Sequence, residues 1–143
     1  MKKYLALMFV VVGGMFASLP AYGQDACANL QGSYGFSRNG TAGSGTISAA
    51  AVGVIVFDGV GNVSGHDTTS VNGNIIRRTF SGTYVVNPDC TGSITVTFIT
   101  GTPGRVSPSD FVIVDDGKGL LLINTNAGEV ILGSARKQSR GDR

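Results

Sequence analysis

Residues 62–86 read NVSGHDTTSVNGNIIRRTFSGTYVV and carry the clearest structural signal in the chain. Asn72-Gly73, near the middle, is a residue pair typical of a two-residue type I′ turn between antiparallel strands. A turn of this type sets the strand register. The numbers of two residues that face each other across the hairpin then add up to 145. The stretch therefore predicts a β-hairpin whose cross-strand partners can be named residue by residue.

The second strand of this hairpin alternates in a way that agrees with the register. One face carries Ile76, Phe80, Gly82, Tyr84 and Val86. The other face is polar, and the same sum pairs it with polar residues such as Ser64 and His66. An antiparallel sheet with one face on the core has this alternation, so we expect the apolar face to point inward.

Two charged residues interrupt the apolar face. Asp67 and Arg78 lie directly opposite one another by the sum of 145, and Gly53 in the preceding strand would leave space beside them. One interpretation is a structural interior salt bridge, which need not stabilise the fold but is costly to break from one side. The other is a pocket arginine that receives a carboxylate or phosphate while Asp67 orients it, with Tyr84 as a further ligand contact. The structural interpretation is favoured, because many ion pairs in small domains are only structural.

The rest of the chain repeats the β pattern. Between residues 24 and 143, short runs of Val, Ile, Phe and Tyr are punctuated by Gly, Asn, Asp and Thr, which is typical of an all-β sandwich or barrel. Candidate strands fall at about 30–38, 48–58, 62–71, 74–86, 93–100, 110–116, 120–125 and 129–137. Most connections are hairpin-sized. The pattern therefore predicts an all-β, eight-stranded antiparallel meander that closes into a small barrel.

Two further turns have a recognisable chemistry. Asp58-Gly59-Val60-Gly61-Asn62 predicts a three-residue loop with Gly61 in the left-handed conformation of a G1 bulge. That loop places Phe57 opposite Val63, so partners in this hairpin sum to 120. Asp116-Gly117-Lys118-Gly119 is expected to form the same kind of three-residue loop with a G1 bulge.

The first 23 residues have the parts of a cleaved signal peptide. Lys2 and Lys3 precede an uncharged, mostly apolar run over residues 4–19, and small residues follow up to Gly23. The run is shorter than the roughly 20 residues needed to span a bilayer. We therefore expect cleavage after Gly23 and a secreted or periplasmic protein with no membrane span after cleavage.

The mature chain has the size of one domain. We expect a barrel domain at 24–138 and a frayed basic tail at 139–143. Once Lys2 and Lys3 are removed, nine cations stand against nine acids. A neutral chain has no long-range field to steer nucleic acid, so nucleic acid is not an expected partner.

Both cysteines lie in the exported part of the chain. In an oxidising compartment, Cys27 and Cys90 are predicted to form a disulfide that closes a loop of about 64 residues and contributes about 4 kcal/mol on the chain-entropy model. In a closed eight-stranded barrel these two residues start on opposite sides. The N-terminal segment would then have to cross and plug the barrel floor.

These features together resemble a known group of proteins. Gly32 and Tyr34 in the first strand, the FDGxGN hairpin and the cross-floor disulfide are similar to small secreted bacterial β-barrel proteins with a calycin-like or allene oxide cyclase-like barrel. The resemblance covers nearly all of residues 30–138. Independently of the resemblance, an eight-stranded barrel has room for packed side chains or for one small ligand.

No residues in the sequence are candidates for catalysis or metal binding. His66 is the only histidine, so catalytic triads and histidine-metal clusters would depend on this one residue, which we expect at the surface. Asp58 with Asn62, and Asp115 with Asp116, are expected to form turns, because the spaced ligands and terminal Glu of a calcium loop are missing. No cofactor is expected.

The leading interpretation is an exported, non-enzymatic β-barrel that serves as a binding or interaction module, for a small apolar or anionic ligand. One alternative is a barrel isomerase or cyclase acting on an apolar substrate. Another is a purely structural or surface-interaction protein. A hollow interior would favour the first two, and a filled interior would favour the third.

The last strands carry a second feature that concerns partners. Residues 112–114, 120–123 and 130–132 are apolar on both faces, whereas a sheet with one wet face alternates. Either a loop such as 101–109 covers the outer face, or a second subunit does. A homo-oligomer through these strands is the expectation.

Overall fold

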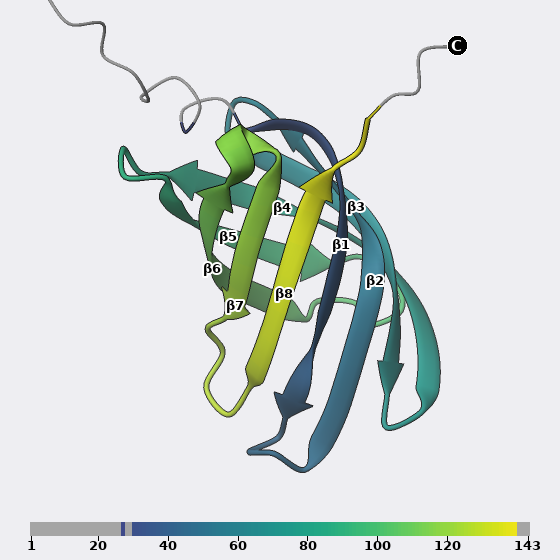
Figure 1. Cartoon of the computed structure of the whole chain (residues 1–143). Helices are drawn as coiled ribbons and strands as arrows, with labels where there is room; N and C mark the ends of the chain where they lie inside the picture. The colour runs from purple at the N-terminus through teal and green to yellow at the C-terminus, as the bar shows by residue number, and fades with distance from the viewer. Residues whose placement is uncertain (1–26, 28–29, 140–143) are drawn as a thin grey trace, which may run out of the picture.

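The computed structural model describes Cys27 and residues 30–139; the predicted signal peptide and residues 140–143 of the predicted tail lie outside this part. Eight strands form one closed barrel in chain order, each antiparallel to its neighbours, and the last strand pairs with the first (Figure 1). The strands are β1 (Gln31–Ala42), β2 (Ile47–Asp58), β3 (Asn62–Val71), β4 (Asn74–Val86), β5 (Thr91–Phe98), β6 (Val106–Val114), β7 (Gly119–Asn124) and β8 (Val130–Lys137). The predicted fold class is confirmed.

The β3–β4 hairpin has the register that its turn dictates. Val71 faces Asn74 and Asp67 faces Arg78, as the sum of 145 requires. Asn72 and Gly73 both have positive φ, at 47° and 85°, which is the conformation that a type I′ turn needs. Local turn chemistry therefore sets which side chains meet in the interior.

The β2–β3 hairpin also agrees with the prediction. Phe57 faces Val63, and Gly61 has a φ of 109°. The Asp58 carboxylate accepts the backbone N–H groups of Val60 and Asn62 at 2.8 and 2.9 Å, so this side chain holds the loop in place.

The β6–β7 turn does not repeat that device, and the prediction for it is wrong. Val114 pairs with Gly119, so Gly119 belongs to the ladder and the loop consists of residues 115–118. The chain reverses earlier, through a short 3₁₀ turn in which Asp115 and Asp116 both have a φ of 53°. Strand β6 also begins at Val106, four residues before the expected start at about 110. Gly119 pairs with Val114 of β6 and with Arg136 of β8. It is therefore part of the sheet and does not form the bulge that the sequence motif predicted.

The end of the barrel that holds the disulfide, hereafter the disulfide end, is closed by aromatic and aliphatic side chains. Tyr34 and Tyr84 lie edge-on to Phe57, with ring centroids 5.4 and 5.0 Å away. Leu30 is 1% exposed, and its carbonyl accepts the hydroxyl of Tyr84 at 2.8 Å. This part of the interior is filled by packed side chains.

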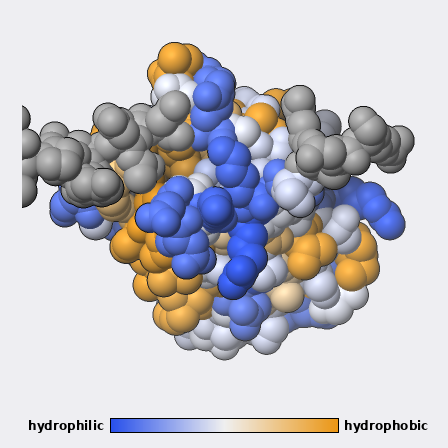
Figure 2. All heavy atoms as spheres, turned by 45° about the horizontal axis from the view of Figure 1, so that its top comes forward, coloured by the Kyte–Doolittle hydropathy of each residue, from blue (hydrophilic) through white to orange (hydrophobic). Residues whose placement is uncertain are grey.

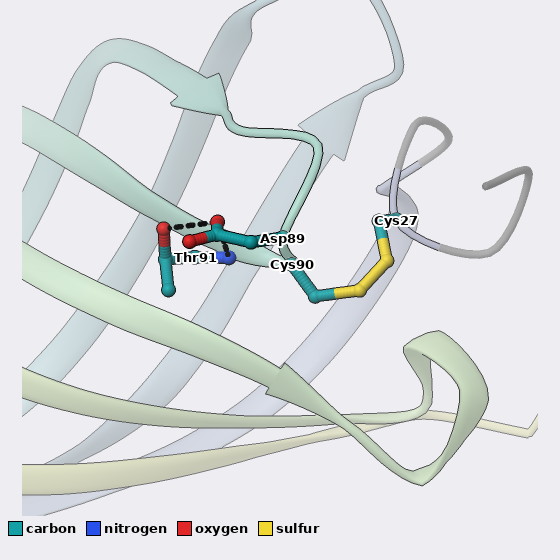
Figure 3. The surroundings of a disulfide bond; sticks show 4 residues. All are labelled: Cys27, Asp89, Cys90 and Thr91. Atoms are coloured by element: carbon teal, nitrogen blue, oxygen red, sulfur yellow. Dashed lines mark hydrogen bonds between the residues drawn. A yellow bond between two sulfur atoms is a disulfide. The ribbon is translucent and has the colours of Figure 1, made fainter. Parts of the chain in front are cut away.

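The disulfide crosses this end, as predicted. Cys27 is bonded to Cys90, with 4.9 Å between their Cα atoms. Cys90 precedes β5, which lies opposite β1 in the closed order of strands. Figure 3 shows Cys27 beside the turn that also carries Asp89 and Thr91, where Asp89 accepts hydrogen bonds from Thr91. The bond therefore fastens the chain before β1 to the far side of the barrel.

The outer face of β6–β8 remains uncovered by the described part of the chain. Val112, Leu121, Ile123 and Leu132 are between 43 and 60% exposed. The loop between β5 and β6 lies at the end of the barrel opposite the disulfide end and does not cover this face. There the Ile99 N–H donates to the Thr79 carbonyl at 2.8 Å. The alternative in which this loop covers the outer face is therefore wrong. Apolar side chains, in orange, gather on the left flank in Figure 2, the side on which β5–β7 lie in Figure 1.

Candidate ligand-binding site

Two adjoining cavities occupy the end of the barrel opposite the disulfide, hereafter the open end. Their volumes are about 60 and about 100 Å³. The side chains that line both are Arg38, Ser107, Asn124 and Ile131. The two spaces therefore form one site with two compartments.

The smaller, inner cavity has apolar walls. Phe36, Phe80 and Phe98 line it together with aliphatic residues of β2, β5 and β7. Phe80 packs edge-on against the other two rings, with centroids 6.2 and 5.8 Å away. Alternation along β1, β4 and β5 turns these rings inward, because every second residue of a strand points to the same face.

The larger, outer cavity is polar on one side. Arg78, Arg105, Thr69 and Glu129 line it. The run Ala49–Ala51 on β2, next to Thr69 on β3, also lines it. These small side chains leave the space that larger residues would fill.

Asp67 and Arg78 form an interior pair, as the register predicted. Arg78 Nε donates to Asp67 Oδ1 at 2.8 Å, and Arg78 Nη2 donates to Oδ2 at 2.5 Å. The Asp67 side chain has no exposed area and that of Arg78 is 7% exposed. The guanidinium carbon lies 3.9 Å from the centroid of the Phe98 ring. This pair is bidentate and desolvated, the geometry in which an arginine-carboxylate contact is strongest.

Gly53 lets β2 approach this pair closely. A Cβ atom at position 53 would lie 2.2 Å from the His66 carbonyl oxygen and 2.7 Å from Asp67 Cβ. The sequence suggested that Gly53 leaves open space beside the pair. In the structure that space is filled by Asp67 and the β3 backbone, so the open volume lies elsewhere.

Arg38 is a site residue that the sequence analysis missed. It projects inward from β1, where its partner on β8 is Gly133; a Cβ atom there would lie 2.9 Å from Arg38 Cβ. Its Nη2 lies 3.8 Å from Asp67 Oδ2 and its Nη1 donates to Ser107 Oγ at 3.4 Å. Burial lowers the pKa of Arg38, and the positive charge of Arg78 lowers it further. The alternation of Tyr34, Phe36 and Arg38 was the available signal, but the expected strand ended at residue 38.

A second ion pair lies at the rim of the open end. Arg105 Nη2, before β6, contacts Glu129 Oε1, before β8. The Arg105 side chain is 47% exposed, so this pair faces solvent. The open end therefore holds three arginines and two carboxylates, Asp67 and Glu129, which leaves one positive charge in excess.

The other residues singled out from the sequence lie away from these cavities. Tyr84 belongs to the disulfide end, where its hydroxyl donates to the Leu30 carbonyl, so the structure does not bring it together with Arg78. His66 is exposed on the outer face of β3. Within Cys27 and residues 30–139, no cluster of three His, Cys, Asp or Glu side chains could hold a metal ion. No helix in that part of the chain is long and apolar enough to cross a membrane.

Comparison with known proteins supports a small closed β-barrel. No family model and no curated protein matches the chain. Among solved structures, it is similar to mFAP1, a redesigned β-barrel bound to DFHBI, at 15% identity and a TM-score of 0.53 over 80% of this chain and all of that one. It is also similar to EF1p2_mFAP2b bound to DFHBI, at 13% identity and a TM-score of 0.54 over 79% of this chain and 98% of that one. A de novo designed fluorescence-activating β-barrel matches at 14% identity and a TM-score of 0.52, over 80% of this chain and 98% of that one.

These matches define the class of the fold and nothing finer. None of them supports the calycin-like or allene oxide cyclase-like resemblance. The chain is an eight-stranded antiparallel barrel that is plugged at one end and has small cavities at the other.

Proposed function

We propose that this protein is an exported, non-enzymatic β-barrel that binds one small molecule at its open end. The observation that carries the proposal is the pair of adjoining cavities, in which aromatic walls meet a few converging polar groups. Ligand sites in proteins have this composition. The disulfide supports an oxidising compartment, since such bonds persist outside the cytosol.

The cavity size limits the ligand. An apolar cavity of about 150 Å³ accepts benzene, and the two compartments together are of that order. Two of the similar designed barrels are bound to DFHBI, which supports small-molecule binding in a barrel of this shape. A ligand of about one ring therefore matches the volume of the two compartments taken together.

Native mass spectrometry of the mature protein, purified from its own host, tests this proposal. We expect one adduct of low mass per barrel. Ala51→Leu should remove the adduct, because residue 51 is buried and lines the outer cavity. Ala127→Leu, an equal change at an exposed loop position, should keep it. A bare wild-type mass, or an adduct that both variants retain, would contradict binding at the open end.

Self-association is a second candidate role, favoured by the exposed apolar face of β6–β8. Val112, Leu121, Ile123 and Leu132 form one apolar surface there, beside a hollow of about 520 Å³ that they line with residues of β5. Contiguous apolar patches on soluble proteins commonly mark interaction sites. We propose a homo-oligomer through this face, which is separate from the ligand site.

A further inference from the structure

The charge at the open end is unbalanced in a specific place. Asp67 is engaged by Arg78 through two short hydrogen bonds, so its carboxylate is already committed. Glu129 is engaged by Arg105 at the rim. Arg38 is the third arginine, and it approaches Asp67 only to 3.8 Å.

Arg38 retains unused hydrogen-bonding capacity. A guanidinium carries five N–H donors. Among the described residues, the Arg38 guanidinium donates one hydrogen bond, a long one of 3.4 Å to Ser107 Oγ. Burial and the neighbouring Arg78 charge oppose the positive charge on Arg38 and lower its pKa. An anion placed against Arg38 would relieve both effects.

The position of Arg38 sets how such an anion would be oriented. Arg38 lines both compartments, so it lies at their junction. Ser107 and Asn124 line both compartments beside it, and the outer cavity adds Thr69 and Arg78 as polar neighbours. The inner cavity offers the rings of Phe36, Phe80 and Phe98. A ligand that spans both compartments would therefore direct its charged group toward the outer one and its apolar body toward the inner one.

We infer that the open end takes a small monocarboxylate with one compact apolar body, such as a single-ring aromatic acid, and that Arg38 binds its carboxylate. A single excess positive charge matches a monoanion, and the planar guanidinium suits a carboxylate. Arg78 acts as a positioning residue, since it holds Asp67 and so fixes the charge beside Arg38. This inference rests on the proposed function and names the ligand class for the same site.

Titration with benzoate and benzyl alcohol, followed by two-dimensional NMR of the mature, disulfide-bonded protein, tests the inference. The two probes share a ring and differ in charge. We expect benzoate to bind more tightly by roughly tenfold or more, since hydrogen bonds to charged groups are the stronger ones. The shifts should be confined to residues that line the two cavities, such as Phe36, Arg38 and Phe98.

Variants separate charge recognition from general binding. Arg38→Met should remove the preference, so that benzoate and benzyl alcohol bind with about equal affinity. Arg38→Lys keeps the charge without the planar donor pair, so it should retain an intermediate preference for benzoate. This variant tests the same inference if Arg38→Met does not fold. Arg77→Met is the matched control, because Arg77 is exposed on the outer face next to Arg78.

The outcomes distinguish this inference from the proposed function. Equal affinity for the two probes, or a benzoate preference that survives Arg38→Met, would overturn the carboxylate assignment while leaving a binding barrel. Failure of both probes to bind also overturns it, and the native mass spectrum then decides separately whether the barrel carries a ligand.

Discussion

Replacing Arg78 with alanine is expected to destabilise the barrel by about 3 kcal/mol. Removal of one partner from a buried ion pair leaves an uncompensated charge and costs roughly 3–5 kcal/mol. The Asp67 side chain has no exposed area, so it has no direct access to water. The loss should fall at the lower end of the range, because Arg38 remains 3.8 Å from the stranded carboxylate.

The opposite change should cost more. Asp67→Ala leaves Arg78 and Arg38 close together without their shared carboxylate, so we expect a loss near 5 kcal/mol, the upper end of the same range. The double variant Asp67→Val with Arg78→Met should be milder than either single change, since no buried charge is orphaned and the volume is largely kept. Arg38 can then turn toward solvent, because its side chain is already 22% exposed.

Urea unfolding of the mature, oxidised protein, followed by circular dichroism, measures these differences in the free energy of unfolding. The comparison requires that the variants share one m-value, the slope of that free energy against urea concentration. Arg77→Ala serves as the control and should stay within about 0.5 kcal/mol of wild type, as surface changes usually do. Losses of no more than about 1 kcal/mol for both single variants, the value of an exposed pair, would refute the reasoning. So would a double variant less stable than either single one.

Three further predictions concern other parts of the molecule. Thiol titration of the unfolded protein should find no free thiol, and Cys27→Ser with Cys90→Ser should lower stability by about 4 kcal/mol; two reactive thiols would contradict the bond. Burial, and secondly the charge of nearby Tyr84, raise the pKa of Tyr34 above its ordinary value of 10.0, so its contribution to stability is complete below that pH and declines as pH rises through the raised pKa. The unfolding free energy should therefore fall more steeply above about pH 10 in wild type than in Tyr34→Phe, and equal slopes would argue against it. Sedimentation should show a dimer or larger species that Leu121→Asp dissociates, whereas a monomeric wild type at high concentration would rule out association through β6–β8.

Local turn chemistry explains why so much of the β2–β4 region could be predicted. Asn72-Gly73 and the Asp58 loop each fix a register, and a register decides which face every flanking residue occupies. The interior pairing of Asp67 with Arg78 follows from that alone. The conformation of the turn at residues 115–118 was predicted wrongly. This turn resembles the Asp58 loop in sequence, but the strand pairing on either side determines its backbone conformation.

The rest of the site depends on closure of the barrel. Arg38 on β1 lies near Asp67 on β3 because β2 pairs with both strands. It lies near Ser107 because closure of the barrel brings β6 opposite β1, across the interior. The contact of Arg105 with Glu129 likewise joins two loops at the rim. No single hairpin contains these contacts, so no turn motif could reveal them. For Arg38, the trace in the sequence is its inward position in the alternation of β1.

Pairing of β8 with β1 has a consequence for the ways in which this protein can be recognised. An open sheet presents a row of unpaired backbone groups, to which an extended peptide can add as a new strand. Each of the eight described strands has a neighbour on both sides in the closed barrel, and free backbone remains where one strand extends past its neighbour, as residues 74–79 of β4 extend past β5. A partner must therefore contact most of this barrel through its outward side chains or its loops, and addition of a strand along a full edge would require the barrel to open first.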